Sequence, residues 1–423
     1  MPPIRRGLLV ATVAGLLLAL APPAGAAGEG PIAPNTWVPA QALPAGGSGT
    51  VLALAVDPHD PQRVLAGTTG GAIDLSTDAG ATWRTVRSGL TGGVLALAFD
   101  PFTAGVVLAG TGDDGVWESR DDGGRWSRVI GGGTGPVRAF AFAPNLTLVG
   151  TDHGVWAGPE AGPWSPTGLE GVAVSALAVV GSGDRPQVVA GGDAGGETAL
   201  PLYRSPDGAR TWVPFIGAIG ASTMVATLAA VPVPGGSVPE LLLGTNAGLF
   251  ASDDGGGSWQ QLTGGGALPP AAFTAVAFAP QRPQRWYVAS DGGGSSEGGL
   301  WVSDDAGAHF SSLQPPAPSV TALAVAGGAT PVLYAATLQP TDQTTRIWSY
   351  RDAGGPPGRA QGPQRPTRVG HAARPSAPVL TSAEDRLLAW LRRPETPYLG
   401  LGALALLVVL LALVTYVRRE RRL

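Results

Sequence analysis

One short apolar segment occurs seven times between residues 51 and 324. The copies begin at Val51, Val94, Val137, Val174, Val225, Phe273 and Val320, at intervals of 43, 43, 37, 51, 48 and 47 residues. The fifth residue is Ala in every copy, and the fourth is always large and apolar, as Leu54 and Phe140 illustrate. A repeat of this length is one supersecondary unit, which buries its apolar face only against its neighbours. The chain is therefore expected to fold as seven similar units.

Each copy is followed by a second strand with a Gly-Thr turn, as in Leu65-Ala-Gly-Thr68, and then by a third strand. The 65 Gly and 40 Pro residues among 423 exclude a mostly helical protein, because both residues destabilise helix interiors. The small fifth residue suits the crowded side of a strand near the axis of a radial array, and the large fourth residue fills the space between sheets. The sequence thus predicts an all-β protein, a seven-bladed β-propeller.

Residues 36–43 look like a fourth strand with no strands before it. Asn35-Thr36-Trp37 is similar to Ala81-Thr82-Trp83, which begins the fourth strand of the first repeat, whereas the seventh repeat has no convincing fourth strand after Ser349. We therefore expect residues 36–43 to complete the last blade and close the ring, so that no edge strand stays open. Because the chain has no Cys, no disulfide is available to help this closure.

A second motif, Ser-x-Asp-x-Gly-x-x-Trp, ends the third strand of most repeats. The matching residues are Ser76, Asp78, Gly80 and Trp83; Ser119, Asp121, Gly123 and Trp126; Ser205, Asp207 and Trp212; Ser252, Asp254, Gly256 and Trp259; and Ser303, Asp305, Gly307 and Phe310. In the fourth repeat Ala209 stands in place of Gly, and in the third only Trp164 remains. The third repeat has Ala157, Pro159 and Ala161 where Ser, Asp and Gly belong, and the seventh keeps Ser349 but has Arg351 and Ala353.

On these motifs, the chain from about residue 36 to residue 353 resembles the Asp-box (bacterial neuraminidase repeat) β-propellers. With the membrane segments described below, it is similar to a single-pass, membrane-anchored bacterial member. The resemblance implies that each box lies in the hairpin joining the third and fourth strands of a blade. Sialidases, sortilin-type receptors, xyloglucan-cleaving enzymes and the photosystem II assembly and stability factor share the motif, so it leaves the function open.

The box residues are interpreted as structural. Short polar side chains bond to nearby backbone N–H groups in tight turns, Gly takes the unusual backbone angle, and Trp packs over the hairpin. The alternative is a metal site, but Asp253-Asp254 lacks the regular ligand spacing and the closing Glu of a calcium loop. The sequence predicts neither a metal nor another cofactor, and no catalytic residue is assigned.

The face opposite the boxes is the candidate binding face. In a four-stranded antiparallel blade the 1–2 and 3–4 turns share one face, and the 2–3 loops lie on the other. Variable loops on a rigid scaffold are where binding sites usually occur. The polar residues of these loops are Asp113, Asp114, Asp152, His153, Asp193, Glu197, Asn246, Asp291 and Glu297. The alternative is that they are solvated acidic turns.

Both ends of the chain carry membrane segments. Residues 1–26 are typical of a secretory signal peptide, with an uncleaved anchor as the alternative. Residues 398–417 form an uncharged apolar stretch that predicts a transmembrane helix rather than a buried core helix, and the basic tail at 418–423 predicts a cytoplasmic C-terminus. Between propeller and span lie a Pro/Gly/Arg-rich spacer at 354–380 and a juxtamembrane segment at 381–397, either a surface helix or a plain stalk.

Charge and motifs together favour a non-enzymatic, extracytoplasmic platform for protein interaction or complex assembly. Residues 27–353 contain 14 Arg and 27 acidic residues, and this negative balance argues against nucleic acid as a partner. The protein is expected in the cytoplasmic membrane as a single-pass type I protein with an extracytoplasmic protein partner.

The alternative functions are a sialidase-like exo-glycosidase and a glycan-binding module. The Arg-Ile-Pro signature of sialidases is missing from the mature chain, and Arg138 is the one Arg that enters an inner strand. The tyrosines inside predicted strands, Tyr203, Tyr287 and Tyr334, have no evident Glu partner. The tryptophans that begin third strands, Trp117, Trp156 and Trp301, are interpreted as inter-blade core rather than as sugar platforms.

Overall fold

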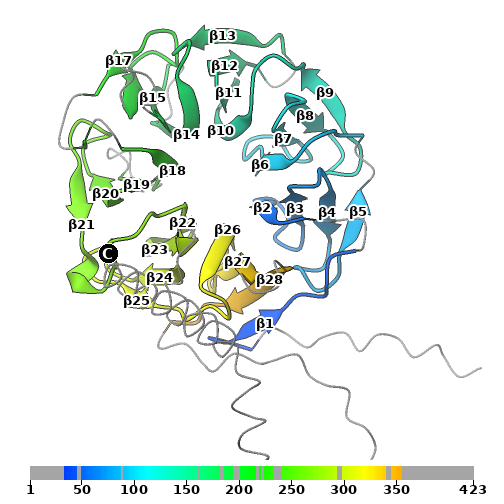
Figure 1. Ribbon diagram of the computed structural model, residues 1–423, viewed down its shortest axis with the longest axis vertical. Coiled ribbons are helices and arrows are strands. Elements are labelled where there is room, and N and C mark those ends of the chain that lie inside the picture. The colour runs from blue at the N-terminus through cyan, green and yellow to red at the C-terminus, as the bar shows by residue number, and fades with distance from the viewer. Residues whose placement is uncertain are drawn as a thin grey trace, which may run out of the picture. The chain divides into compact units, whose positions relative to one another are not determined.

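The computed structural model describes residues 33–354 apart from ten short internal segments, and these residues form a closed ring of β-sheets (Figure 1). The segments outside the description are 45–48, 87–88, 160–161, 182–184, 194–200, 216–218, 221–222, 232–239, 293–297 and 340–343. The signal peptide, the juxtamembrane segment, the membrane helix and the basic tail predicted above all lie outside the described residues, as does the spacer after Gly354. Within the described part, no helix has both the length and the apolar character needed to cross a membrane.

Seven antiparallel sheets of four strands each make up the ring, which confirms the predicted seven-bladed all-β fold. Blade 1 contains β2 (Val51–Val56), β3 (Val64–Thr68), β4 (Ile73–Ser76) and β5 (Arg84–Val86); blade 2 contains β6 (Val94–Phe99), β7 (Val107–Thr111), β8 (Val116–Ser119) and β9 (Ser127–Ile130); blade 3 contains β10 (Val137–Ala143), β11 (Leu146–Thr151), β12 (Gly154–Gly158) and β13 (Ser165–Gly168). Blade 4 contains β14 (Ala173–Val180), β15 (Gln187–Asp193), β16 (Leu202–Ser205) and β17 (Val213–Pro214); blade 5 contains β18 (Val225–Ala230), β19 (Leu241–Thr245), β20 (Gly248–Ser252) and β21 (Gln260–Leu262). Blade 6 contains β22 (Ala275–Ala279), β23 (Arg282–Ser290), β24 (Gly299–Ser303) and β25 (Ser311–Ser312); blade 7 contains β26 (Ser319–Ala326), β27 (Val332–Gln339), β28 (Thr344–Arg351) and the N-terminal β1 (Trp37–Pro39). A 3-10 turn, η1 (Gly264–Gly266), follows β21.

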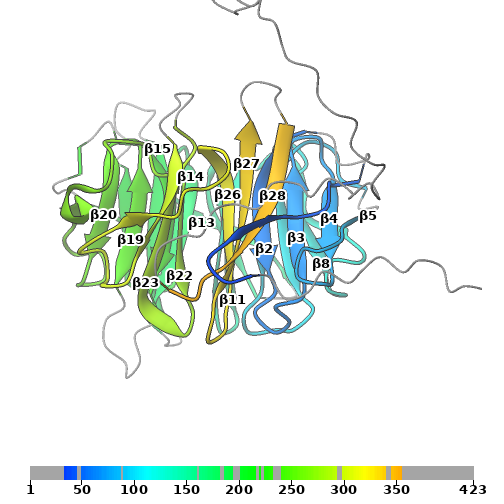
Figure 2. The same cartoon turned by 90° about the horizontal axis from the view of Figure 1, so that it is seen from below.

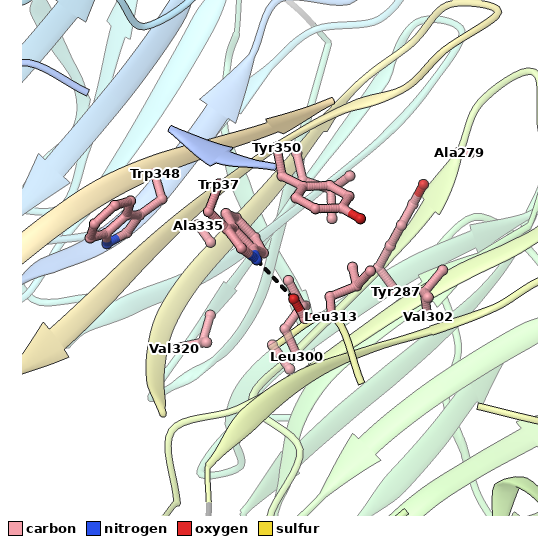
Figure 3. Close-up of a cluster of buried hydrophobic side chains, with 12 residues drawn as sticks. Trp37, Ala279, Tyr287, Leu300, Val302, Leu313, Val320, Ala335, Trp348 and Tyr350 are labelled. Carbon is pink, nitrogen blue, oxygen red and sulfur yellow. Dashed lines mark hydrogen bonds between the residues drawn. The ribbon is translucent and has the colours of Figure 1, made fainter. Parts of the chain in front are cut away.

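The ring is closed by β1, as predicted, although the strand is shorter than the expected residues 36–43. Its residues pair with β28 in antiparallel register, Val38 opposite Ser349, so the two ends of the described chain lie side by side (Figure 1). Trp37 is 1% exposed, and its indole N–H donates a 2.8 Å hydrogen bond to the carbonyl of Leu313 (Figure 3). The Trp37 ring also packs at 4.8 Å from the ring of Tyr350. The first strand therefore joins the last blade through both its backbone and its side chain.

Close approach between blades explains the Gly of the repeated Gly-Thr turns and the equivalent Gly191 of blade 4. A Cβ added at Gly67 would lie 2.5 Å from Val94 Cγ1, and one added at Gly191 would lie 2.4 Å from Val225 Cγ1. Val94 and Val225 each begin the innermost strand of the next blade. Any larger residue would therefore push neighbouring blades apart.

The turns of the blades divide between two faces, which Figure 2 shows edge-on. On one face, Arg63 of the 1–2 turn of blade 1 lies 3.0 Å from the carboxylate of Asp122 in the box turn of blade 2. On the other, the backbone N–H of Gly112 in a 2–3 loop donates a 2.9 Å hydrogen bond to the carbonyl of Gly93, just before the next first strand. We refer to these as the box face and the 2–3 face.

Candidate functional site

The box turns are built from the hydrogen bonds that turn chemistry requires. In the first of them, Ser76 Oγ accepts a 2.8 Å bond from the N–H of Gly80 and donates to Asp78 Oδ1 at 2.8 Å. Asp78 Oδ1 also accepts the N–H of Thr82 at 2.8 Å. The Trp83 indole N–H donates to the carbonyl of Gly80 at 3.0 Å. The polar atoms of the motif are therefore used inside the turn rather than presented to a ligand.

The box carboxylates are stabilised as anions by these bonds. A backbone N–H four residues ahead, from Thr211, Ser258 or His309, holds the pKa of Asp207, Asp254 and Asp305 respectively at about 2. A low pKa disfavours a role in proton transfer near neutral pH. Within the described residues, no group of three His, Asp or Glu side chains is arranged to hold a metal ion.

Three of the polar residues predicted on the 2–3 face fasten loops, namely Asp114, Asp152 and Asn246. Asp114 accepts a 2.8 Å bond from Arg128 and weaker bonds from the Trp117 indole and the Thr91 N–H. Partial burial raises the pKa of Asp114, but the bonds from Thr91 and Arg128 outweigh this effect and lower it. Asp114 is thus already neutralised by its own blade and the preceding loop.

The remaining residues of this face are distributed over the 2–3 loops of blades 2 to 6. Asp152 accepts a 2.9 Å bond from Arg138, and Asn246 accepts a 2.9 Å bond from the N–H of Met224. Asp113 and His153 are exposed on neighbouring blades, and Asp291 is half-buried on blade 6. The side chain of Asp193, together with Glu197 and Glu297, lies outside the described residues.

A buried polar cluster, which the sequence did not predict, connects blades 6 and 7. Arg285 donates two 2.5 Å bonds to the two carboxylate oxygens of Asp352, and the Tyr287 hydroxyl donates a 2.6 Å bond to the same group. All three side chains are buried, and Arg285 also contacts Asp304 at the box face. Burial and the charge of Asp352 raise the pKa of Tyr287, so its hydroxyl stays protonated. Because Arg285, Tyr287 and Asp352 are at most 3% exposed, the cluster acts as an inter-blade fastening.

A groove lies between blades 2 and 3 of the described structure. Its volume is about 910 Å³, within the range of ligand sites. The lining residues are Glu118, Arg120, Ser127, Val129, Ile130, Gly131, Gly132, Gly133, Thr134, Trp156, Gly162, Pro163 and Trp164. They come from β8 and the turn after it, from the outer strand β9 and the connection that follows it, and from β12 and the altered third box, so the groove lies toward the outer rim of the ring. We call it the blade 2–3 groove.

The groove lies where few apolar side chains are buried between the two blades. The described core cluster here has five buried members, Leu108, Val116, Ile130, Val137 and Val149, whereas the other six inter-blade clusters have between 8 and 12. Trp156 and Trp164 pack against it but stay partly exposed. Trp156 was expected to belong to the inter-blade core. It packs against that core but also lines the groove.

The polar groups of the groove combine one ion pair with two indole donors. Glu118 is 5% exposed and is paired with Arg120, which reaches toward solvent. In blade 1 the corresponding position is occupied by the apolar Leu75. The sequence carried a hint of this site, because the third repeat has lost the box residues around Trp164, but the pairing of Glu118 with Arg120 had no counterpart in other repeats.

Comparison with known proteins gives no match to a protein-family model and none to a curated protein. Solved structures do match. The glycoside hydrolase family 74 xyloglucanase from Xanthomonas campestris is 19% identical with a TM-score of 0.53, covering 73% of this chain and 55% of that one. An ancestral enzyme of the same family has 16% identity and a TM-score of 0.54, with 73% and 47% covered. This chain therefore spans about half the length of those enzymes.

A second kind of neighbour is matched over nearly its whole length. YCF48 bound to D1 peptide is 16% identical with a TM-score of 0.52, covering 74% of this chain and 96% of that one. YCF48 from Cyanidioschyzon merolae is 14% identical with a TM-score of 0.51, and 98% of it is covered. At these identities the likeness concerns the fold. The chain has a seven-bladed β-propeller fold similar to that of glycoside hydrolases and of YCF48.

Proposed function

We propose that this chain is a non-enzymatic, membrane-tethered propeller that binds an extracytoplasmic protein partner and serves as an assembly platform. The observation that carries the proposal is the blade 2–3 groove, an open site whose only lining carboxylate among the described residues, Glu118, is already paired with Arg120. Ordinary glycoside hydrolysis uses two carboxylates that flank the scissile bond. The groove is thus better suited to binding than to hydrolysis.

The size match supports the same proposal. The match covers almost all of YCF48, whose structure is described with a bound D1 peptide. It covers only about half of each xyloglucanase-family chain. The predicted signal peptide, membrane helix and basic tail would display the propeller outside the cytoplasmic membrane as a single-pass type I protein. The Asp-box resemblance at five repeats is compatible with this role.

A glycan-binding module is the second candidate. The likeness to xyloglucanases and the two partly exposed tryptophans of the groove favour it, because aromatic faces commonly present apolar surface to ligands. A sialidase-like activity has less support, since Tyr287 pairs with Asp352 and Arg285 in a fully buried cluster rather than in an open cleft.

The test is site-specific photo-crosslinking of the full-length chain in intact cells. A photoreactive residue is placed at Gly131 in the groove, at His153 on the 2–3 face and at Ser258 on the box face, all of which are exposed. We expect one protein adduct that depends on position. Turnover of a fluorogenic sialoside or of xyloglucan by the purified chain, with no position-dependent adduct, would contradict the proposal.

A further inference from the structure

We propose that the blade 2–3 groove binds an extended, proline-rich segment of a partner protein that carries basic residues beside its prolines. The inference rests on the proposed function and adds the chemistry of the partner. It is based on the hydrogen-bond donors, the aromatic walls and the bare backbone of the groove, taken together with the charge of the propeller.

The groove presents indole N–H groups without acceptors. Trp83 and Trp126 donate their indole N–H to the carbonyl of the box glycine at 3.0 Å. Trp164 occupies the same position in blade 3, and its N–H has no acceptor among the described residues. The indole N–H groups of Trp212 and Trp259 also lack an acceptor there but are buried, so the partial exposure of Trp164 is what makes its N–H accessible to a ligand. The N–H of Trp156 also has no acceptor there, whereas its counterpart Trp117 donates to Asp114. Two donors on partly exposed rings thus line one cavity.

Another part of the groove lining is backbone without side chains. Gly131, Gly132 and Gly133 follow β9 and are all exposed. A Cβ added at Gly131 would meet nothing within 4 Å, so the space in front of this wall is open. Neither Gly132 nor Gly133 makes a backbone hydrogen bond to the described residues. A ligand can therefore lie directly against the peptide groups.

A proline-rich segment matches this set of groups better than other peptides do. In the polyproline II conformation its carbonyls point outward without internal hydrogen bonds, and proline has no N–H that would need an acceptor. Its rings pack against aromatic walls, and the preformed helix loses little entropy on binding. A donor-rich, aromatic groove such as this one is complementary to a chain that offers carbonyls and apolar rings.

The charge of the propeller indicates basic flanking residues. Residues 27–353 contain 27 acidic residues and 14 Arg, and the predicted net charge of this part is strongly negative. Within the groove Glu118 and Arg120 pair with each other, so the attraction for a basic segment comes from the net charge of the propeller as a whole. Arg or Lys beside the prolines would be attracted by this net negative charge, which speeds association.

The experiment measures binding of labelled peptides to the full-length chain in detergent micelles. One peptide has 12 residues with two Pro-x-x-Pro units and an Arg at each end; the second has Ala in place of every Pro. We expect saturable binding of the first and at least ten-fold weaker binding of the second. Trp164→Phe and Trp156→Phe each remove one N–H donor and are expected to weaken binding about five- to ten-fold. Trp301→Phe, at the equivalent strand position of blade 6, is the matched control and should bind as the parent does.

A second variant guards against loss of folding. Gly131→Leu adds a side chain in open space on an exposed residue, so it should leave the melting temperature unchanged while blocking the groove. Equal binding of the two peptides, or full binding by Gly131→Leu, would overturn the proposal. Displacement of the peptide by xyloglucan oligosaccharides at lower concentration than by the unlabelled peptide would also overturn it in favour of a glycan. If photo-crosslinks to a partner form only from His153, this inference fails while the proposed function stands; if no partner is found from any position, the proposed function fails.

Discussion

Single residues in the box turns occupy a backbone conformation that most side chains avoid. Gly80, Gly123, Gly256 and Gly307 all have φ between 83° and 88°, and each faces a neighbouring blade. Ala209 adopts φ 68° at the same position of the fourth box and is fully buried. The sequence predicted that Gly takes an unusual angle here, and Ala209 shows that the turn persists where the neighbouring blade leaves room for a methyl group.

Gly307→Ala is expected to be destabilising. Its Cβ would lie 2.5 Å from a ring carbon of the buried Trp286, and the left-handed backbone adds strain. Together these effects should lower the free energy of unfolding by about 2–4 kcal/mol. Denaturant titration measures the change. The control is Gly112→Ala, whose Cβ would meet only the Gly93 carbonyl at 3.9 Å, and a similar loss in that variant would contradict the explanation.

The low pKa values of the box carboxylates predict that the free energy of unfolding decreases in acid. Because the pKa of Asp207, Asp254 and Asp305 is about 2 in the fold against 3.8 ordinarily, their contribution is complete above pH 4 and is lost as the pH falls toward 2. Melting temperatures between pH 5 and pH 2 measure this. The triple variant with Asn at these positions should show a shallower fall over that interval; an unchanged slope would show that other groups dominate.

At the scale of elements, the position of β1 could be predicted from the sequence, whereas the buried polar cluster between blades 6 and 7 could not. The closing strand was predictable because residues 35–37 repeat the pattern of residues 81–83 and the seventh repeat lacks its own fourth strand. The cluster of Arg285, Tyr287 and Asp352 was not, because it joins residues 65 and 67 positions apart that occur in no other repeat. A sequence pattern that recurs in several repeats predicts which strands pair. A contact that occurs in only one repeat cannot be predicted in this way.

Trp37→Ala should weaken the closure severely. The side chain is 1% exposed, contacts Tyr350 and bonds to Leu313, so its removal is expected to cost about 3–5 kcal/mol. Chemical unfolding of the full chain measures this loss, and Trp37→Phe should lose less because it keeps most of the apolar contact. Thr36→Ala, next to it, bonds only to Pro34 from an exposed site and should be close to neutral. If Trp37→Ala unfolds at the parent midpoint, β1 does not hold the ring closed.

Two buried tyrosines of the same region provide a matched pair. Tyr287→Phe removes a hydroxyl that donates to the buried carboxylate of Asp352 and should cost about 1.5–3 kcal/mol. The hydroxyl of Tyr350 is buried with no hydrogen-bond partner among the described residues, and its burial near Asp352 raises its pKa to about 12. Tyr350→Phe should therefore be neutral or slightly stabilising in the same unfolding measurement. The reverse order of the two effects would contradict the hydrogen-bond pattern.

At the scale of the whole molecule, the number of blades, their order and the two faces could all be predicted from seven copies of one segment. The blade 2–3 groove could not. It arises where several usual contacts are missing at once, namely the box residues of blade 3 and part of the apolar packing behind Val149. The missing box residues of blade 3 predict that its turn differs from the others. They do not show whether other side chains fill the space that the usual residues would occupy. The 2–3 face was chosen by a general rule about loops, and three of its residues, Asp114, Asp152 and Asn246, are bonded to other residues of their own blades.

The predicted membrane topology can be tested on the full chain with reporters. Alkaline phosphatase fused after residue 353 should be active, because the propeller is expected outside the cytoplasmic membrane. The same enzyme fused after Leu423 should be inactive, since the tail with Arg418, Arg419, Arg421 and Arg422 is expected in the cytoplasm. Activity of both fusions would show that the apolar stretch at 398–417 does not span the membrane.

The pairing of β1 with β28 also bears on how the protein is made. Val38 leaves the ribosome 311 residues before Ser349, whose hydroxyl donates to the Val38 carbonyl. At 5–20 residues per second, the first strand waits roughly 15–60 seconds for the strand it must join. During translation the growing protein is thus an incomplete arc with two unsatisfied edges, and its most aggregation-prone interval ends only when synthesis of the seventh blade is finished.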